Sequence, residues 1–315
     1  MPAASITVLM PAYNPGPHFE AAVRSILLQR FSDFELLILD DGTQDGSLDI
    51  LSALQDPRIR LIRNSRNLGL VETLNTGLRE AGARYIARMD ADDIAHPDRL
   101  GQQLAFMQAH PDVAICGTWS RTIGEGITSW ETHYPVGHAD IVCHMLFNTG
   151  LTHPTVMLDR AQLQQHGLAY EGRHPHAEDY DLWTRAAHVV RLANLPQVLL
   201  DYRVHDTQVS SSHKESQKQS ARRIRENLIR SLTPSAYLSD FEIHNQISEY
   251  DWPSHSSFYK MAVQWLKALS RHIQTDRPDL WPSAHAVCRA KALEIHQHVY
   301  QNKKRWKRAL LKYTF

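Results

Sequence analysis

The chain has few of the features that would place it in a membrane, on nucleic acid or in an oxidising compartment. None of its segments reaches the run of about 18 apolar residues at which a helix can cross a bilayer. Its 34 lysines and arginines balance its 34 aspartates and glutamates, so it lacks the positive charge expected of a nucleic-acid-binding protein. We therefore expect a soluble globular protein with no nucleic-acid partner.

Cysteine is also scarce. Cys116, Cys143 and Cys288 are scattered and have neither a metal-binding nor a redox spacing, so we expect reduced, structural thiols. The first residues, 1–5, contain no basic region and lead into a β-type run rather than an apolar signal segment, which favours the cytoplasm.

The segment after the first apolar run lacks the motifs of three classes of nucleotide- or phosphate-binding enzymes. The segment 11–17 contains no G-x-G-x-x-G, which excludes a nicotinamide-dependent dehydrogenase, and no D-x-D-x-T, which an aspartyl phosphatase requires. A sugar-phosphate nucleotidyltransferase is the closer alternative, but its glycine-rich loop with arginine and lysine is replaced here by residues 12–16, Ala-Tyr-Asn-Pro-Gly.

Short β-type runs alternate with helical patterns over the first two thirds of the chain. We predict strands at 6–10, 36–39, 59–62, 85–89, 113–116, 155–158 and 198–203, and helices at 19–30, 48–54, 70–81, 97–107 and 179–187. Residues 117–150 look irregular, as loops or short strands over the site. This alternation predicts an α/β fold with a mostly parallel sheet, in which ligands bind at the carboxyl ends of the strands.

The composition changes near residue 213. Residues 214–232, 256–273 and 283–311 have helical patterns and contain no strand candidate, so we predict a catalytic domain at 1–213 and a helical C-terminal region at 214–315. The last pattern ends in a basic segment, 303–312, that alternates with apolar residues. Such an end either lies on an anionic membrane surface or is a solvated helix face.

Three carboxylates follow the fourth predicted strand directly. Asp90 and Asp92 point to the same side of an extended segment, and Asp93 comes next. Hard oxygen ligands select Mg²⁺ or Mn²⁺, which would bridge the two phosphates of a nucleotide sugar. The alternative is a solvated acidic loop that caps the next helix.

A second candidate site lies after the first two strands. Pro11 and Tyr13 offer a surface that could pack on a base, and Asp40 could accept a hydrogen bond from the N3–H of a pyrimidine. Taken alone, Asp40 and Asp41 would more simply cap a helix that begins near Asp45. Arg66 could donate bidentate hydrogen bonds to a diphosphate.

A third candidate begins a predicted helix. Glu178 and Asp179 lie where a helix N-terminus partly stabilises a carboxylate, and Asp179 could deprotonate a sugar hydroxyl that attacks an anomeric carbon. One in-line displacement of this kind inverts the anomeric configuration. The alternative is a structural helix cap.

Together these segments resemble the inverting glycosyltransferase family 2, whose three-layer α/β/α architecture is called GT-A. The resemblance covers about residues 5–212 and depends on seven motifs in order: Pro11-Ala12-Tyr13-Asn14, Asp40-Asp41-Gly42-Thr43, Arg66-Asn67-Leu68-Gly69, Asp90-Ala91-Asp92-Asp93, Thr152-His153-Pro154, Glu178-Asp179 and Tyr202-Arg203-Val204-His205. It does not extend to residues 213–315.

The resemblance implies a role for each matching residue. Asp179 would be the catalytic base and Glu178 would orient hydroxyl groups. The metal would be held by Asp92 with Asp90, and His205 or Arg203 would meet the metal or the diphosphate. His153 and Trp183 would line the acceptor side, although a His-Pro turn can equally be structural. The nucleotide-sugar site would comprise Pro11, Tyr13, Asn14, Asp40, Asp41, Arg66, Asn67, Gly69, Asp90, Ala91 and Arg203.

The resemblance also implies an activity. We expect transfer of a sugar, with Mn²⁺ or Mg²⁺, from a nucleotide-diphosphate donor, most simply a UDP-sugar, to a glycan or lipid-linked acceptor of lipopolysaccharide, capsule or exopolysaccharide synthesis. The enzyme would work in the cytoplasm or at the inner face of the membrane, and a homodimer is left open. The alternatives are a degenerate carbohydrate-binding or assembly module of the same fold and the nucleotidyltransferase named above.

Overall fold

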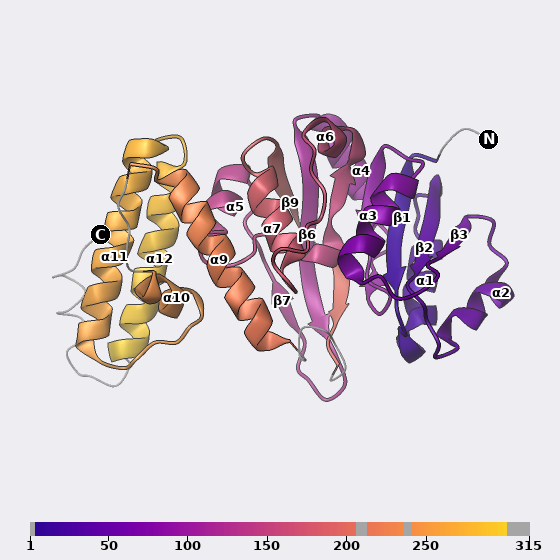
Figure 1. Ribbon diagram of the computed structural model, residues 1–315, viewed down its shortest axis with the longest axis horizontal. Coiled ribbons are helices and arrows are strands. Elements are labelled where there is room, and N and C mark those ends of the chain that lie inside the picture. Colours follow the sequence, from indigo (N-terminus) through magenta and orange to yellow (C-terminus); the bar gives the residue numbers. More distant parts are fainter. Residues whose placement is uncertain (1–3, 206–212, 236–240, 301–315) are drawn as a thin grey trace. The chain divides into compact units, whose positions relative to one another are not determined.

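A computed structural model describes residues 4–205, 213–235 and 241–300. Its element order is β1 (Ile6–Ala12), α1 (Phe19–Leu27), β2 (Phe34–Asp40), α2 (Ile50–Leu54), β3 (Ile59–Arg63), α3 (Leu70–Glu80), β4 (Tyr85–Arg88), β5 (Ile94–Ala95), α4 (Arg99–Ala109), β6 (Val113–Ile123), β7 (Trp130–Thr132), α5 (His138–His144), β8 (Met157–Asp159), α6 (Arg160–Gln165), α7 (Glu178–Ala186), β9 (Arg191–Arg203), α9 (Lys214–Leu232), α10 (Glu242–Ser248), α11 (Ser256–Asp276) and α12 (Trp281–Tyr300). Figure 1 shows these elements along the chain.

The strands form one mixed sheet in the order β3-β2-β1-β4-β8-β6-β9-β5, with β7 beside β6. The pairs β1/β2, β1/β4, β2/β3 and β6/β9 are parallel. Strands β8, β7 and β5 are antiparallel to their neighbours. The predicted α/β fold is therefore confirmed, and β1, β2 and β4 direct their carboxyl ends to one edge.

Apolar side chains cover both faces of the sheet, which gives the three layers. Ile6, Val8 and Met10 point from β1 into the core that includes side chains of α1 and α4. On the opposite face α3 lies so close that an added Cβ at Gly77 would be 2.2 Å from Cδ1 of Leu9. Because strand residues alternate between faces, a strand covered on both sides is apolar at almost every position.

Two strands, β6 and β9, are longer than the sequence predicts by seven residues each. β6 continues from the predicted 113–116 to Ile123, through the segment that we expected to be irregular, and β9 begins at Arg191 rather than 198. Gly117, which favoured a loop in the sequence, lies inside β6. Only glycine fits there, because an added Cβ would be 2.2 Å from Oδ1 of Asn194 on β9. The glycine marks a close approach of two strands rather than a turn.

Helix predictions also needed correction. α1 ends at Leu27 rather than 30, and three short helices, α5, α6 and α10, were missed because each offers no more than two turns of periodicity. α12 is described to Tyr300, so the basic segment 303–312 lies outside the described residues.

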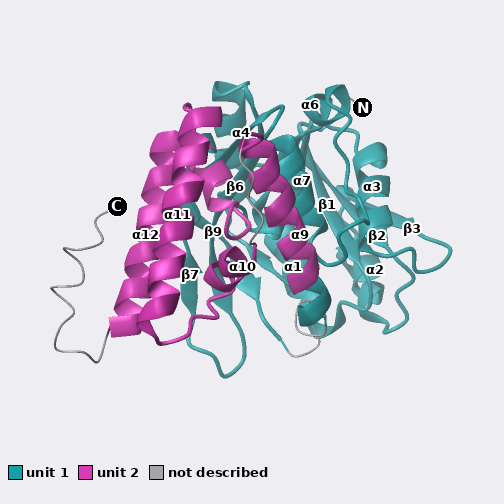
Figure 2. Ribbon diagram, turned by 60° about the vertical axis from the view of Figure 1, so that its left-hand side comes forward, with its two compact units in different colours: residues 1–138, 151–217 teal, residues 139–150, 218–315 magenta. Residues whose placement is uncertain are grey.

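The contacts divide the chain into two compact units, which Figure 2 colours separately. Unit 1 comprises residues 1–138 and 151–217 and contains the sheet. Unit 2 comprises residues 139–150 and 218–315, so α5 belongs to the same unit as the C-terminal helices. Within unit 2, His244 of α10 accepts a hydrogen bond from Nε1 of Trp265 at 3.0 Å and its Nε2 lies 2.7 Å from the carbonyl oxygen of Leu146.

Candidate active site

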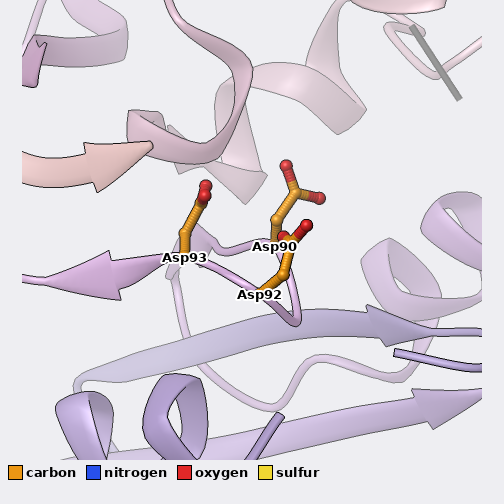
Figure 3. Close-up of side chains that lie close together, drawn as sticks. All are labelled: Asp90, Asp92 and Asp93. Atoms are coloured by element: carbon orange, nitrogen blue, oxygen red, sulfur yellow. The ribbon is translucent and has the colours of Figure 1, made fainter. Parts of the chain in front are cut away.

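Three carboxylates come together just beyond β4. Oxygen atoms of Asp90, Asp92 and Asp93 all lie within 4.8 Å of one another, and Figure 3 shows their side chains on one short loop. Asp93 is fully buried, whereas Asp90 and Asp92 are half-buried. The small side chain of Ala91 is buried between them. This is the grouping that the sequence predicts for a cation site.

Asp90 is held by a buried arginine. Both terminal nitrogens of Arg88 lie 2.6 Å from its carboxylate oxygens. Burial raises the pKa of Asp90, while the charge of Arg88 opposes that rise. The carbonyl oxygen of Arg88 accepts a 2.6 Å hydrogen bond from Arg99, whose burial lowers its pKa to about 9. Two buried arginines thus fix the start of the acidic loop.

Asp93 has one engaged and one free oxygen. Its Oδ1 accepts a hydrogen bond from the backbone N–H of Arg203 at 2.7 Å, whereas its buried Oδ2 has no partner among the described residues. Burial, followed by the charges of Asp90 and Asp92, raises the pKa of Asp93 well above its ordinary value. An unsatisfied buried carboxylate oxygen is costly and indicates a ligand or a proton.

Asp92 connects the acidic loop to the end of β9. Its Oδ2 is 2.9 Å from Nε2 of His205, and its carbonyl oxygen accepts a 2.8 Å hydrogen bond from Nε of Arg203. The imidazole of His18 lies beside His205, with ring centroids 5.8 Å apart. The structure thus brings the predicted Asp92, Arg203 and His205 together and adds His18.

This set of side chains fits a hard divalent cation. The free oxygens are Oδ2 of Asp93 and the second oxygen of Asp92, and the imidazole of His205 is adjacent. Carboxylate oxygens are the preferred ligands of Mg²⁺ and Mn²⁺. Asp93, which the sequence places in the acidic cluster but the family resemblance does not name as a metal ligand, is at least as well placed as Asp90, since Arg88 occupies both oxygens of Asp90.

Two adjacent carboxylates, Glu178 and Asp179, begin α7. Glu178 is buried and Asp179 is partly exposed, and Oδ1 of Asp179 accepts a 2.7 Å hydrogen bond from the N–H of Tyr180. Burial, followed by the neighbouring Glu178, raises the pKa of Asp179 to about 7, and burial also raises that of Glu178. A carboxyl group with a pKa near neutrality has the proton affinity that a general base needs.

The start of α7 is held from both sides. Asp181 accepts from Nε of Arg185 at 2.8 Å and from Nε of Arg173 at 3.2 Å. His176, just before the helix, has a φ of 62°, which is rare for a residue with a side chain. Its carbonyl oxygen accepts a 2.9 Å hydrogen bond from Gln217. These contacts fix the backbone that carries Glu178 and Asp179.

The two residues predicted to line the acceptor side, His153 and Trp183, have their rings in contact. Nε2 of His153 is 2.9 Å from the hydroxyl of Tyr170, and the ring of Trp183 lies behind, with centroids 5.9 Å apart. Burial lowers the pKa of His153 well below its ordinary value, so the ring is neutral. Trp183 is fully buried. It therefore packs behind His153 and does not face an acceptor, contrary to the sequence prediction.

At the end of β1 the candidate base-binding surface is open. Tyr13 is 55% exposed and Pro11 is half-buried. Asn14, with a φ of 45°, accepts a hydrogen bond from the N–H of Gln44 at 2.8 Å and so ties this loop to the one after β2. The ring of Tyr13 is thus available for packing on a ligand, on a loop fixed by Asn14.

Asp40 forms a turn as well as lining this edge. Its Oδ1 accepts hydrogen bonds from the N–H groups of Gly42 at 3.1 Å and Thr43 at 2.7 Å, and its Oδ2 is 3.4 Å from Nε of Arg63. The alternative in which Asp40 and Asp41 cap the next helix is wrong, because Gly46 precedes the short 3-10 helix Ser47–Asp49 that leads into α2, and Asp49 precedes α2 itself.

Asp41 organises the loop before α3. Its two oxygens accept hydrogen bonds from the side-chain amide of Asn64 and from the N–H groups of Leu68 and Gly69, at 2.8, 2.8 and 2.9 Å. Asp41 and Gly69 therefore serve the structure of the predicted nucleotide loop. Asn67 accepts from the N–H of Gly69 at 3.0 Å, and the exposed Arg66 has no ion-pair partner among the described residues.

Sequence reasoning missed several residues of this site. Arg88, Tyr170 and His18 belong to none of the motifs, since Arg88 lies in the apolar strand β4, His18 directly precedes α1 and Tyr170 lies in the segment between α6 and α7. The one available signal was the charge of Arg88 in the otherwise apolar strand 85–89, because a charge in such a strand must find a partner.

Comparison with known proteins agrees with this geometry. The model of the family described as "Glycosyl transferase family 2" matches residues 7–165. The chain belongs to this family. Its resemblance to family 2 and its prediction as an enzyme are thereby confirmed.

Two relatives show the extent of the similarity. An uncharacterised glycosyltransferase of Haemophilus influenzae is 32% identical over 237 residues, which cover 71% of this chain and 73% of the relative. The Escherichia coli protein named UDP-Glc:alpha-D-GlcNAc-diphosphoundecaprenol beta-1,3-glucosyltransferase WfgD is 27% identical over 214 residues, which cover 66% of this chain and 80% of the relative.

Two solved structures share the fold. Staphylococcus aureus TarS 1-349, solved with UDP-GlcNAc, aligns with a TM-score of 0.61 at 18% identity and covers 96% of this chain and 92% of TarS. The mannosyltransferase PcManGT of Pyrobaculum calidifontis, solved with GDP-Man and Mn²⁺, aligns with a TM-score of 0.57 at 16% identity and covers 96% of this chain and 88% of PcManGT. At these identities the likeness concerns the fold alone. Across the described residues, no helix has the length and apolar character needed to span a bilayer.

Proposed function

We propose that this glycosyltransferase moves a sugar from a nucleoside-diphosphate donor to an acceptor hydroxyl with inversion at the anomeric carbon. The carrying observation is the position of Arg88. It pairs with Asp90 of the carboxylate cluster, and its charge also opposes the rise that burial and Glu178 cause in the pKa of Asp179 on α7. One buried side chain thus links the candidate diphosphate site to the candidate base.

On the donor side, Tyr13 and Pro11 would pack on the base, and Arg66 and Arg203 would meet the diphosphate. Asp92, with Asp93 or Asp90 and His205, would hold Mn²⁺ or Mg²⁺. When bound, such a cation stabilises the negative charge of the departing diphosphate. A UDP-sugar is the donor that we propose, supported by the UDP-glucose in the name of WfgD and the UDP-GlcNAc bound to TarS.

On the acceptor side, Asp179 would take the proton of the attacking hydroxyl. Glu178 would orient the hydroxyls, and the neutral His153 would face the acceptor while Tyr170 and Trp183 hold its ring. In this proposal the base and the diphosphate site would lie on opposite sides of the sugar, so attack and departure would be in line and the configuration would invert. A general base of this kind contributes about 10²–10⁴-fold to the rate.

For the acceptor we propose a glycan or a lipid-linked sugar of a cell-surface polysaccharide. The lipid diphosphate in the name of WfgD supports this class. The sequence of residues 303–312, rich in lysine and arginine, supports work at an anionic membrane surface from the cytoplasmic side.

Calorimetric binding tests the donor site. UDP, dTDP, GDP and CMP are titrated with and without Mn²⁺ into wild type, Asp92→Asn and the control Asp112→Asn, whose carboxylate is exposed and paired with Arg191. We expect UDP to bind only with Mn²⁺, with binding lost in Asp92→Asn and kept in the control.

Two outcomes would contradict the proposal. UDP binding by Asp92→Asn with unchanged manganese dependence would remove Asp92 from the metal site. Failure of all four nucleotides to bind wild type would instead favour the degenerate carbohydrate-binding module.

A further inference from the structure

The two compact units differ in charge, although the chain as a whole is neutral. Unit 2 has 17 lysines and arginines and 9 aspartates and glutamates, so its formal charge is +8, and unit 1 therefore carries −8. A separation of this size is not required by the α/β fold, because neither unit needs a net charge in order to pack its core. It points to a partner for unit 2 that is anionic.

The α11–α12 hairpin contains a long region without carboxylates. No Asp or Glu occurs in residues 252–275, 280–293 or 295–315. The outer stripe of α11 carries Lys260, Gln264, Lys267 and Arg271, at the spacing of one helix face. Figure 2 shows α11 and α12 side by side in unit 2, and α12 contributes the exposed Arg289.

Three of these cations differ from most others in unit 2. Lys260, Arg271 and Arg289 are exposed, and none has an ion-pair partner among the described residues. In contrast, the cations that are paired with carboxylates of the same unit are Lys218, Arg222, Arg225, Arg230, Arg277 and Lys291. The positive charges of Lys260, Arg271 and Arg289 are therefore not neutralised by carboxylates of the described residues.

Apolar groups accompany these charges. Met261 on α11 is 50% exposed and Leu293 on α12 is 45% exposed. Met261 directly follows the exposed Lys260, and Leu293 lies one helical turn after the exposed Arg289. Large apolar side chains set among unpaired cations are typical of surfaces that enter the headgroup region of an anionic bilayer. Contacts to nucleic acid go mainly to phosphates and base edges, so exposed Met and Leu side chains favour lipid as the anionic partner.

The basic C-terminal segment begins at the same end of the hairpin. The rings of Tyr259 and Tyr300 are in contact, with centroids 5.7 Å apart, so the chain leaves α12 beside the first turn of α11, where Lys260 and Met261 lie. The residues beyond, 301–315, include six lysines and arginines together with Trp306, Leu310 and Phe315. The hairpin surface and this segment are therefore continuous along the chain.

We propose that the outer surface of the α11–α12 hairpin, defined by Lys260, Met261, Arg271, Arg289 and Leu293, is a docking surface for anionic lipid. The C-terminal segment would add to it, but the folded hairpin binds lipid in its own right. Two separate basic and apolar elements would hold the enzyme at the bilayer more firmly than either one, since their binding contributions combine. The inference does not depend on the transferase reaction.

Sedimentation with vesicles tests this surface in the full-length chain without nucleotide. The vesicles contain phosphatidylcholine alone or with 30 mol% phosphatidylglycerol, at low salt, and their composition sets the charge that the protein meets. Each lysine or arginine near an anionic surface changes partitioning by roughly fivefold. The triple variant Lys260→Gln, Arg271→Gln, Arg289→Gln should therefore bind the anionic vesicles at least tenfold more weakly than wild type.

The matched control removes the same number of charges from the same unit at exposed positions that are already paired. Lys218→Gln, Arg230→Gln, Arg277→Gln neutralises cations bound to Glu249, Glu226 and Asp279. We expect it to bind anionic vesicles within about threefold of wild type, because its charges are compensated in the folded chain. Circular dichroism confirms that both variants are folded.

Three results would overturn the proposal. They are equal binding of wild type to neutral and anionic vesicles, binding by the hairpin variant within twofold of wild type, and equal loss in the hairpin and control variants. The last result would show an effect of net charge alone. UDP binding by the folded hairpin variant should be unchanged, so failure here is separate from failure of the proposed activity.

Discussion

Replacement of Asp179 by asparagine should make the protein inactive and more stable at the same time. Asparagine has nearly the same shape and its Oδ1 still accepts the hydrogen bond from the N–H of Tyr180. What it loses is the carboxyl proton and the negative charge. A residue kept for catalysis at a cost in stability behaves in this way, whereas a structural helix cap would only become weaker.

The size of the stability effect follows from the pKa. That of Asp179 is about 7 in the folded chain. In the unfolded chain it is about 3.9, so the shift of roughly three units corresponds to at most about 4 kcal/mol. Because the side chain is partly exposed, relaxation and water reduce this, and we expect about 2 kcal/mol.

The sign is opposite to that of a salt-bridged aspartate. Between pH 4 and pH 7 the folded chain keeps a proton that the unfolded chain has lost, so the free energy of unfolding falls as the pH rises. Asp179→Asn removes this fall. We expect the variant and wild type to have similar stability near pH 4 and the variant to be more stable at pH 8.

Thermal unfolding between pH 4 and pH 8 measures this difference, and a few degrees in Tm are expected at pH 8. Transfer activity should fall by about 10²–10⁴-fold in the variant. In wild type, kcat/KM should drop about tenfold per pH unit below pH 7, because Asp179 that is protonated in the free enzyme cannot act as a base. The control Asp112→Asn removes an exposed carboxylate with none of these effects.

Either of two findings would refute this reasoning. If the difference in Tm between variant and wild type did not change with pH, the pKa of Asp179 would not be raised in the folded state. If Asp179→Asn instead lost donor affinity strongly, Asp179 would belong to the donor site and not to the acceptor side.

Two further predictions concern the scaffold. Asp41→Ala leaves three loop donors without their acceptor and should lower the free energy of unfolding by about 3 kcal/mol in urea titrations, and a loss no greater than that of the exposed Asp49→Ala would contradict this. Gly77→Ala places a Cβ 2.2 Å from Leu9 and should destabilise by about 1–3 kcal/mol. The control Gly101→Ala, with its nearest neighbour at 3.6 Å, should be neutral or stabilising by up to about 1 kcal/mol, and equal effects would refute the packing argument.

The sequence was sufficient for the family, the fold class and most of the strands at the site. Runs such as Leu36–Leu39 are apolar at every position, which only a strand buried on both faces tolerates, and the polar motifs follow directly after them. Order along the chain and the rule that parallel strands share a carboxyl edge then place Tyr13, Asp40 and Asp92 on one edge. None of this needs a long-range distance.

Periodicity failed where an element is short or where a long-range contact replaces local propensity. α5 and α10 are too short to show a helical pattern, and β6 continues past Gly117 because the strand beyond it pairs with β9. In the sequence a glycine at a close approach looks the same as a glycine in a turn. Tertiary pairing decided these cases.

The sequence by itself determined which chemical groups the site could contain, since carboxylates, arginines and histidines occur in ordered motifs. Only the tertiary structure decided which of these groups bind one another and which remain available to a ligand. Arg88 binds Asp90, Asp93 keeps a buried oxygen without a partner among the described residues, and Asp41 accepts hydrogen bonds from the loop before α3. Such roles depend on burial and on partners far along the chain, because desolvation and nearby charges set both the pKa and the free hydrogen-bonding capacity of a side chain.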